Sequence, residues 1–276
     1  MFRIAPTPSG YLHLGNAFSF LLTRCLADRA GAGLMLRIDD LDSERTRPEY
    51  VQDVFDSLDW LGIHWEKGPK DPDDFERNWS QHHRLPDYME AIERMRTDGK
   101  IFACRCTRNQ LKAYGSVYPD LCASTEIPFG EPDTVLRIRV PSGTAISFDD
   151  HAMGRRTVDL TAAMGSFTVL RRDGIPAYQL ASVVDDRLFG VTTIVRGTDL
   201  LASTAAQCFL ADAIGFGSFH HSRFFHHRLL TDEKGEKLSK SEGAFSLKSM
   251  RESGITREDV LRRLQPFLDE YLERNL

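Results

Sequence analysis

A loop near the start of the sequence has residue types that suit phosphate binding. The segment PSGYLHLGN (residues 8–16) lies between a strand candidate, FRIAP, and a helix candidate that begins near Asn16. Free backbone N–H groups and the positive dipole end of a helix attract phosphate. His13 could hydrogen-bond a phosphate and stabilise the negative charge that develops on it. Gly15 would let a nucleotide approach the backbone closely. The segment predicts a nucleotide site, although a plain loop with a surface histidine fits it equally well.

A second charged pattern lies near the other end of the sequence. KLSKS (residues 237–241) follows the turn DEKG. Lys237 and Lys240 would bring flexible point charges, and Ser239 a hydroxyl group, to a pyrophosphate leaving group. Alone, this composition is more common in a solvated loop, so the functional interpretation depends on the two patterns occurring together.

Three of the five cysteines lie in one short stretch. The five are Cys25, Cys104, Cys106, Cys122 and Cys208. An odd number without a secretory leader argues against a disulfide framework. Cys104, Cys106, Tyr118 and Cys122 form the pattern C-x-C-x11-Y-x3-C. Three thiolates and one phenolate would fill the tetrahedral shell that structural zinc prefers, and the alternative is a set of free thiols in a reducing compartment.

Two further groups of polar residues could belong to a site. Asp39 and Asp40 follow the strand candidate LMLRI, where they would either bind a cation or cap the next segment. The histidine pairs are His220 with His221 and His226 with His227. Neighbouring residues on a strand point to opposite faces, so we interpret these pairs as structural or as lying near the nucleotide site.

Strand and helix patterns alternate at both ends of the sequence. They predict an α/β fold in which residues 1–80 and 180–240 form two halves of a Rossmann-type parallel sheet. Residues 81–179 change character and are expected to form an insertion, with the cysteine segment 104–122 inside it. Residues 241–276 are expected to form a short C-terminal helical segment, with Asp259 near the capping-box position of a helix from Thr256.

Composition restricts the class of protein. The chain has 276 residues, 41% hydrophobic and 27% charged, which is ordinary for a globular protein. No apolar run is long enough to span a bilayer, and the first residues lack the layout of a secretory signal, so we expect a cytoplasmic protein. The net charge of -5 gives no support for nucleic-acid binding, although a local basic patch could still provide it. We expect neither a membrane nor DNA as a partner.

Taken together, the patterns resemble a known family. HLGN and KLSKS are similar to the HIGH and KMSKS signatures of class I aminoacyl-tRNA synthetases. RxAPTPSGxLHLGN, LRIDDLD, DWLGIHW, LRRDGxxAYQLAxVVDD and VRGTDL resemble the glutamyl and glutaminyl branch, and together with KLSKS the motifs extend from Arg3 to Ser241. The resemblance implies ATP as a substrate, with Mg²⁺, and catalytic roles for His13, Lys237 and Lys240. The ATP-binding residues that it implies are His13, Gly15, Asn16, Lys237, Ser239 and Lys240. Asn16 replaces the second histidine of HIGH and can still donate a hydrogen bond.

The same resemblance implies a pocket for an acidic amino acid. Two carboxylates and one ammonium require two cationic anchors and one anionic anchor. By resemblance, Arg3 and Arg196 would bind the carboxylates, Tyr178 would add a hydroxyl group and Asp39 would hold the ammonium. The implied glutamate-binding residues are Arg3, Ala5, Thr7, Asp39, Tyr178 and Arg196. Bacterial glutamyl enzymes resemble R-I-E-D where this chain has R-I-D-D, and glutaminyl enzymes resemble the aspartate form, so glutamate and glutamine both remain open.

The cysteine spacing narrows the resemblance further. It is similar to that of the glutamyl-queuosine tRNA(Asp) synthetases, a family of short glutamyl-tRNA synthetase paralogues. This implies one structural Zn²⁺, no anticodon-binding domain, and transfer of L-glutamate, activated without tRNA, to queuosine of tRNA(Asp). Two alternatives stay open. One is a truncated synthetase-like enzyme for another acceptor, such as a protein or small molecule. The other is a catalytically silent nucleotide- or RNA-binding module, against which the intact set of charged site residues argues.

Overall fold

The central element of the fold is a mostly parallel sheet, seen in a computed structural model that describes residues 1–115, 117–230 and 246–274. From β2 to β9 the neighbouring strands are parallel, and β6 pairs antiparallel with β5. In sheet order the strands are β2 (Leu34–Leu36), β1 (Phe2–Ile4), β8 (Thr193–Gly197), β9 (Arg223–His227), β5 (Ala145–Asp150) and β6 (Gly154–Asp159). The expected α/β fold with a parallel sheet is therefore confirmed.

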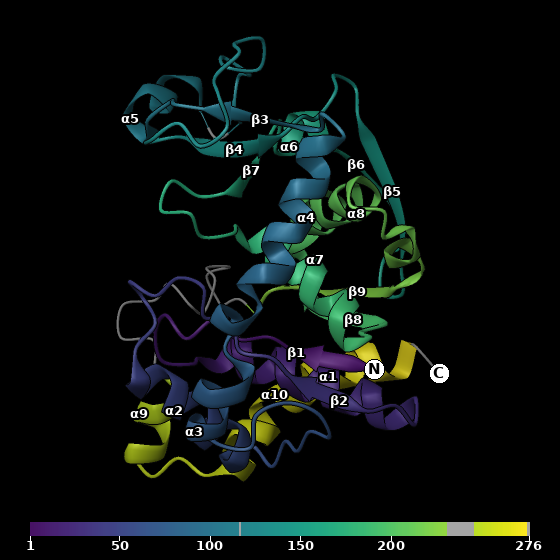
Figure 1. The fold of residues 1–276 in the computed structure, drawn as a ribbon. Coiled ribbons are helices and arrows are strands. Elements are labelled where there is room, and N and C mark those ends of the chain that lie inside the picture. The colour runs from purple at the N-terminus through teal and green to yellow at the C-terminus, as the bar shows by residue number, and fades with distance from the viewer. Residues whose placement is uncertain (116, 231–245, 275–276) are drawn as a thin grey trace.

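Ten α-helices surround the strands in the described part of the chain (Figure 1). They are α1 (Leu14–Arg29), α2 (Pro48–Trp60), α3 (Pro72–Asp74), α4 (Leu85–Thr97), α5 (Arg108–Leu111), α6 (Leu160–Ala163), α7 (Tyr178–Phe189), α8 (Leu201–Ala213), α9 (Leu247–Glu252) and α10 (Arg257–Arg274). Helix α2 shows how the sequence specifies them. Pro48 occupies its first turn, its buried Val51, Val54 and Leu58 repeat at helical spacing, and Gly62 takes the positive φ just after its end.

The insertion carries a small sheet of its own. Strands β3 (Ile101–Cys104), β4 (Val135–Ile138) and β7 (Thr168–Leu170) pair antiparallel in that order. In Figure 1 this sheet lies at the top of the molecule, and α4, α7 and α8 lie between it and the parallel strands. The buried hydrophobic residues form two clusters. One lies around α4, α7 and α8, and the other lies around α1, α2 and α10.

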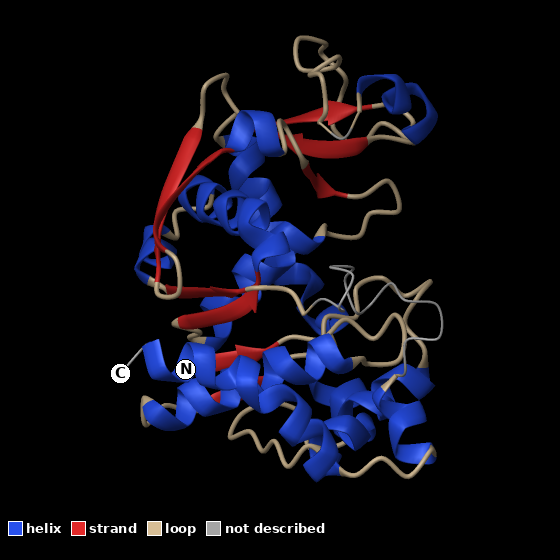
Figure 2. Ribbon diagram, turned by 180° about the vertical axis from the view of Figure 1, so that it is seen from behind, coloured by secondary structure: helices blue, strands red, loops and turns tan. Residues whose placement is uncertain are grey.

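The hairpin β5–β6 differs from the expected segmentation. Its residues were expected in the insertion, yet Asp150 pairs with Phe224 of β9, so the hairpin, at the left of Figure 2, extends the main sheet. The side chain of Asp150 also accepts hydrogen bonds from the backbone N and the ring Nδ1 of His226. These contacts join residues 76 positions apart, which a local pattern of strand residues cannot reveal.

The C-terminal helix begins as the sequence predicts. Thr256 Oγ1 accepts from the backbone N of Asp259, whose carboxylate accepts from the backbone N of Thr256. This reciprocal capping box starts α10, which packs against α1 through buried Leu264 and Leu268. None of the helices in the described ranges is both long and apolar enough to cross a bilayer.

Candidate active site

One cavity of about 500 Å³ lies at the carboxyl ends of β1, β8 and β9. Ligands of open parallel sheets bind at this edge, because the loops that follow the strands meet there. The cavity wall brings together eight of the residues predicted from the sequence: Arg3, Ala5, Thr7, His13, Gly15, Asn16, Tyr178 and Arg196. The two halves of the sheet therefore supply one shared site.

The loop before α1 is held by a reciprocal cap. His13 Nδ1 accepts from the backbone N of Gly15 at 3.1 Å, and Asn16 Oδ1 accepts from the backbone N of His13 at 3.0 Å. Nδ1 is therefore unprotonated, which places the ring proton on Nε2 as a donor. A Cβ on Gly15 would lie 3.0 Å from the His13 ring, so any larger residue would have to displace that ring by a few tenths of an ångström. The departure from HIGH at Asn16 has a structural role, since its side chain caps the helix.

Arg196 is the least compensated charge of the cavity. Its side chain is buried, and its Nη2 donates to Oε1 of Gln207 at 2.8 Å. Its Nε and Nη1 have no hydrogen-bond partner among the described residues. Burial, together with the nearby Arg3, lowers the pKa of Arg196 to about 10. A buried guanidinium with two donors left over favours an anionic ligand.

Arg3 belongs instead to a balanced ion cluster beside the cavity. Its Nε donates to Asp186 Oδ1, which also accepts from Arg37 Nη1 at 2.7 Å. The cluster contains three arginines and three aspartates, so its formal charges cancel: Arg3, Arg37, Arg84, Asp39, Asp185 and Asp186. Arg196 makes no ion pair within the described part of the chain, and its positive charge is additional to this neutral cluster.

Asp39 is placed differently from the other predicted pocket residues. It does not line the cavity, and both of its oxygens accept from Arg37, at 2.6 and 3.1 Å. Burial raises the pKa of Asp39, and the charge of Arg37 opposes that rise. The carboxylate of its neighbour Asp40 does not cap the next segment of the chain, because it accepts from Ser80 Oγ and from the backbone N of Gln81, 40 and 41 positions further on.

The predicted residues Lys237, Ser239 and Lys240 lie outside the described residues. The residues on either side of that segment are described, and both are at the site. Leu230 lines the cavity, and Ser246 forms a β-bridge with His13. The backbone N of Leu247 donates to Leu12 O at 2.7 Å.

The histidines of β9 divide into two roles. His226 is buried between Asp150 and Thr204, which makes it structural. His227 lines the cavity with an Nε2 that has no partner among the described residues. Burial lowers the pKa of both rings, so neutral imidazoles are favoured. The surface residue His220 pairs with Asp212 instead.

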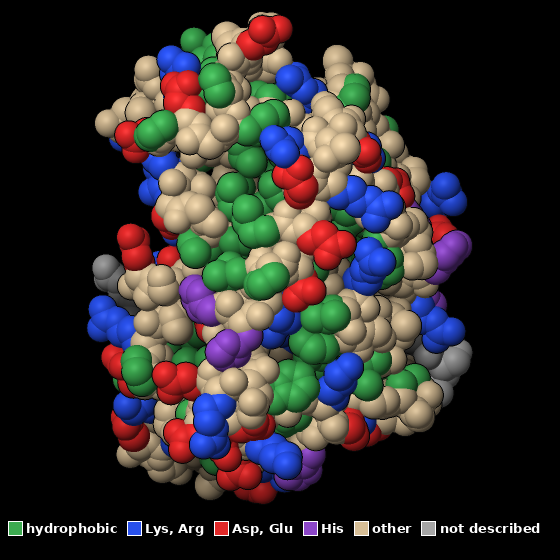
Figure 3. All heavy atoms as spheres, viewed as in Figure 1, with side chains coloured by type: hydrophobic (Ala, Val, Ile, Leu, Met, Phe, Trp, Pro, Cys, Tyr) green, Lys and Arg blue, Asp and Glu red, His purple; other side chains and the backbone are tan. Residues whose placement is uncertain are grey.

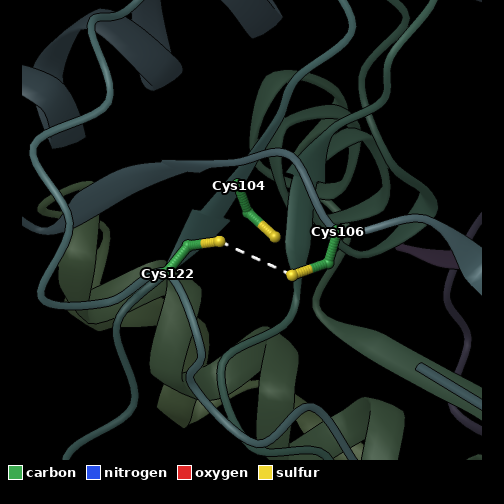
Figure 4. Close-up of side chains that lie close together, drawn as sticks. All are labelled: Cys104, Cys106 and Cys122. Atoms are coloured by element: carbon green, nitrogen blue, oxygen red, sulfur yellow. Dashed lines mark hydrogen bonds between the residues drawn. The ribbon is translucent and has the colours of Figure 1, made fainter. Parts of the chain in front are cut away.

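The cysteine motif forms one cluster in the insertion, well away from the cavity. Cys104 ends β3, Cys106 follows it, and Cys122 approaches from a later loop, so that the three sulfurs converge (Figure 4). All three lie within 4.8 Å of one another, and Cys106 Sγ is 3.5 Å from Cys122 Sγ. The Tyr118 hydroxyl lies 3.3 Å from Cys104 Sγ and 4.0 Å from Cys106 Sγ.

These separations suit a tetrahedral metal site. With Zn–S bonds of about 2.3 Å, two thiolates of a tetrahedron are roughly 3.8 Å apart, close to the distances found here. Burial would raise the pKa of Cys122, but hydrogen bonds from the Arg105 backbone and from Tyr118 outweigh it and lower the pKa to about 7. Burial and hydrogen bonds with Cys122 and Cys104 raise the pKa of Cys106 to about 11, so a bound metal would have to displace the proton of that thiol. The four predicted ligand residues, Cys104, Cys106, Tyr118 and Cys122, thus lie next to one another in space.

The sequence did not single out several residues that shape the site. Asp186 accepts a hydrogen bond from Arg3, and Gln207 accepts one from Arg196. Asp199 and His227 add polar groups to the cavity wall. Gln207 left one signal, because it is an amide within the apolar run of α8 and is fully buried there. A buried amide needs a partner, but the sequence cannot identify Arg196 as that partner.

Comparisons with known proteins identify the class. The family model "tRNA synthetases class I (E and Q), catalytic domain" matches residues 1–118 and 123–267. The chain belongs to this family of class I tRNA synthetases, and it is an enzyme of the ligase class.

Two relatives are close in length. The chain is 34% identical to the glutamyl-Q tRNA(Asp) synthetase of Nitratidesulfovibrio vulgaris, covering 94% of this chain and 83% of that protein. It is 38% identical to the protein of the same name from Symbiobacterium thermophilum, covering 95% and 84%. The resemblance to glutamyl-queuosine tRNA(Asp) synthetases predicted from the motifs is thus confirmed.

Longer proteins also match. The chain is 34% identical to a glutamate–tRNA ligase of Sulfurihydrogenibium, but it spans only 57% of that protein. Among solved structures, a glutamate tRNA ligase of Elizabethkingia meningosepticum has a TM-score of 0.72 at 23% identity, covering 92% of this chain and 53% of that one. This likeness shows the fold.

Proposed function

We propose that the chain activates L-glutamate with ATP, without tRNA, and transfers it to queuosine of tRNA(Asp). The observation that carries the choice of amino acid is the uncompensated charge of Arg196 in the cavity. Glutamate has a net charge of -1 at neutral pH and glutamine has none, so the buried guanidinium of Arg196, with two unpaired donors facing the cavity, favours glutamate. The departure at Asp39 bears less on this choice, because Arg37 occupies both of its oxygens.

Each residue of the cavity would have a role that follows from its position. Arg196 and Arg3 bind the carboxylates and Tyr178 adds its hydroxyl group, which orients the α-carboxylate for attack on the α-phosphorus of ATP. Pyrophosphate leaves as the new acyl–phosphate bond forms. His13, aligned by its own cap, donates from Nε2 to the phosphates, next to Gly15 and Asn16. Lys237, Ser239 and Lys240 would stabilise the leaving group, and Mg²⁺ would accompany ATP.

Support for tRNA(Asp) as the acceptor comes from the relatives. The two proteins named for it are matched over 83% and 84% of their length, whereas the glutamate–tRNA ligase is matched over 57%. On the face in Figure 3, acidic and basic side chains are interspersed, so local contacts and not a broad basic surface would have to hold the RNA there. A cytoplasmic location remains a prediction.

The acceptor is tested with two preparations of tRNA(Asp), one that contains queuosine and one with unmodified guanosine. Incubation with ATP and radiolabelled glutamate should label only the first. The control is tRNA(Glu), which should stay unlabelled. Equal labelling of both tRNA(Asp) preparations, or label on tRNA(Glu) alone, would contradict this acceptor and leave activation of glutamate to be judged separately.

We further propose that Cys104, Cys106, Tyr118 and Cys122 bind one Zn²⁺. Four ligands close a tetrahedral shell and leave no position for a substrate, so the ion would be structural. It would tie the end of β3 to the later loop of the insertion.

Metal analysis of protein purified without chelator should find about one zinc per chain. Replacement of Cys122 by serine should remove most of the zinc and lower the Tm, because metal binding contributes to folding. The matched control is Cys25→Ser, a half-buried cysteine outside the cluster, which should retain the metal. Wild-type protein that is consistently free of zinc would rule the site out.

A further inference from the structure

The two cavity arginines are held from behind by partners of different charge. Arg3 Nε donates to the carboxylate of Asp186, whereas Arg196 Nη2 donates to the neutral amide of Gln207 at 2.8 Å. Gln207 and Arg196 lie on different elements, α8 and β8, and both are buried. Their hydrogen bond therefore positions the guanidinium against the helix that covers the sheet.

The orientation of the amide is fixed by chemistry. A guanidinium only donates, so the oxygen of Gln207 must face Arg196, and its Nε2 is then left without a partner among the described residues. An unsatisfied buried N–H is unfavourable, because it has lost its hydrogen bonds to water. A glutamate at this position would have the same length, make a stronger charge-assisted bond and leave no N–H unsatisfied. The amide is therefore a poor choice for stability alone.

The effect of residue 207 on the charge that a ligand meets explains why it is glutamine and not glutamate. A carboxylate at position 207 would neutralise Arg196 before any substrate arrives. The amide fixes the guanidinium and leaves its charge uncompensated, with Nε and Nη1 unpaired and Arg196 on the cavity wall. We propose that Gln207 is the positioning residue that makes the pocket select an amino acid with an anionic side chain over its neutral amide. This inference rests on the proposed function and adds the reason why glutamate is preferred to glutamine.

The test compares three variants by isothermal titration with sodium glutamate and with glutamine. Wild-type protein should bind glutamate more tightly. In Gln207→Glu the preference for glutamate should fall by roughly 10- to 100-fold, the range expected for one charged hydrogen bond. Gln207→Met removes the acceptor without adding charge, so it should weaken glutamate binding by about 10-fold while glutamate stays preferred. Gln52→Glu adds the same charge on an exposed face of α2 and should leave both affinities unchanged.

The outcomes separate this inference from the proposed function. A wild-type preference for glutamate that persists unchanged in Gln207→Glu would overturn the inference. If Gln207→Glu does not fold, judged by circular dichroism, wild-type glutamate affinity in Gln207→Met would overturn it instead. ATP–pyrophosphate exchange by wild-type protein is measured alongside. Binding without exchange would count against the proposed activation while the affinity ratios still decide the role of Gln207.

Discussion

Replacing Arg196 by methionine should reduce kcat/KM for glutamate-dependent ATP–pyrophosphate exchange by about 100-fold or more. A buried charged pair that loses one partner is destabilised by about 3–5 kcal/mol, and 1.4 kcal/mol corresponds to about a factor of ten. Methionine keeps much of the side-chain volume and removes the two unpaired donors. The loss should be seen mainly in KM, because Arg196 binds a carboxylate that does not change charge during the reaction.

The stability of this variant provides an internal check. Arg196 has no counter-ion among the described residues, so its removal relieves an uncompensated buried charge and adds Gln207 Oε1 to the Nε2 of the same amide, which already lacks a partner there. The Tm should therefore change by only a few degrees. Arg155→Met is the matched control, since that side chain is 71% exposed in a surface pair with Asp149. Wild-type exchange in the Arg196 variant, or a loss explained by unfolding, would contradict the role of Arg196.

Replacing Lys240 by alanine should slow exchange by about 100-fold or more, mostly in kcat. Charge moves onto the leaving pyrophosphate as the α-phosphate is attacked, and a lysine that follows this shift stabilises the transition state more than the bound substrate. Lys240 lies outside the described residues, but the described residues before and after that segment, Leu230 and Ser246, lie at the cavity and beside His13.

Steady-state kinetics separate this role from simple ATP binding. The KM for ATP should change much less than kcat in Lys240→Ala. Lys70→Ala, which removes an exposed lysine from the loop before α3, should behave as wild type. An unchanged kcat in Lys240→Ala would mean that another cation stabilises the leaving group.

Local patterns in the sequence predicted much of this molecule. The capping box at Thr256 and the strand–loop–helix around His13 are set by residues a few positions apart. The convergence of the cysteine motif was also foreseeable, because its members lie within 19 residues in segment 104–122. Each of these features depends on turn chemistry, capping or periodicity, which are local properties.

The rest depended on which distant side chains meet. No residue of β6 is buried and β5 does not alternate regularly, so only the contact of this hairpin with β9 places it on the main sheet. Asp39 is expected at the ammonium of the ligand, and the sequence did not predict that Arg37, two residues away, would pair with it. The pairing of Gln207 with Arg196 joins a helix to a strand, and no spacing rule predicts it.

The central claim is that this chain activates glutamate on its own. The most direct test is ATP–pyrophosphate exchange with purified protein, no tRNA, and either glutamate or glutamine. We predict exchange that depends on glutamate and is far weaker with glutamine, as the positive charge of Arg196 requires. No exchange with glutamate in protein that is folded and binds ATP, or equal exchange with both amino acids, would contradict the account.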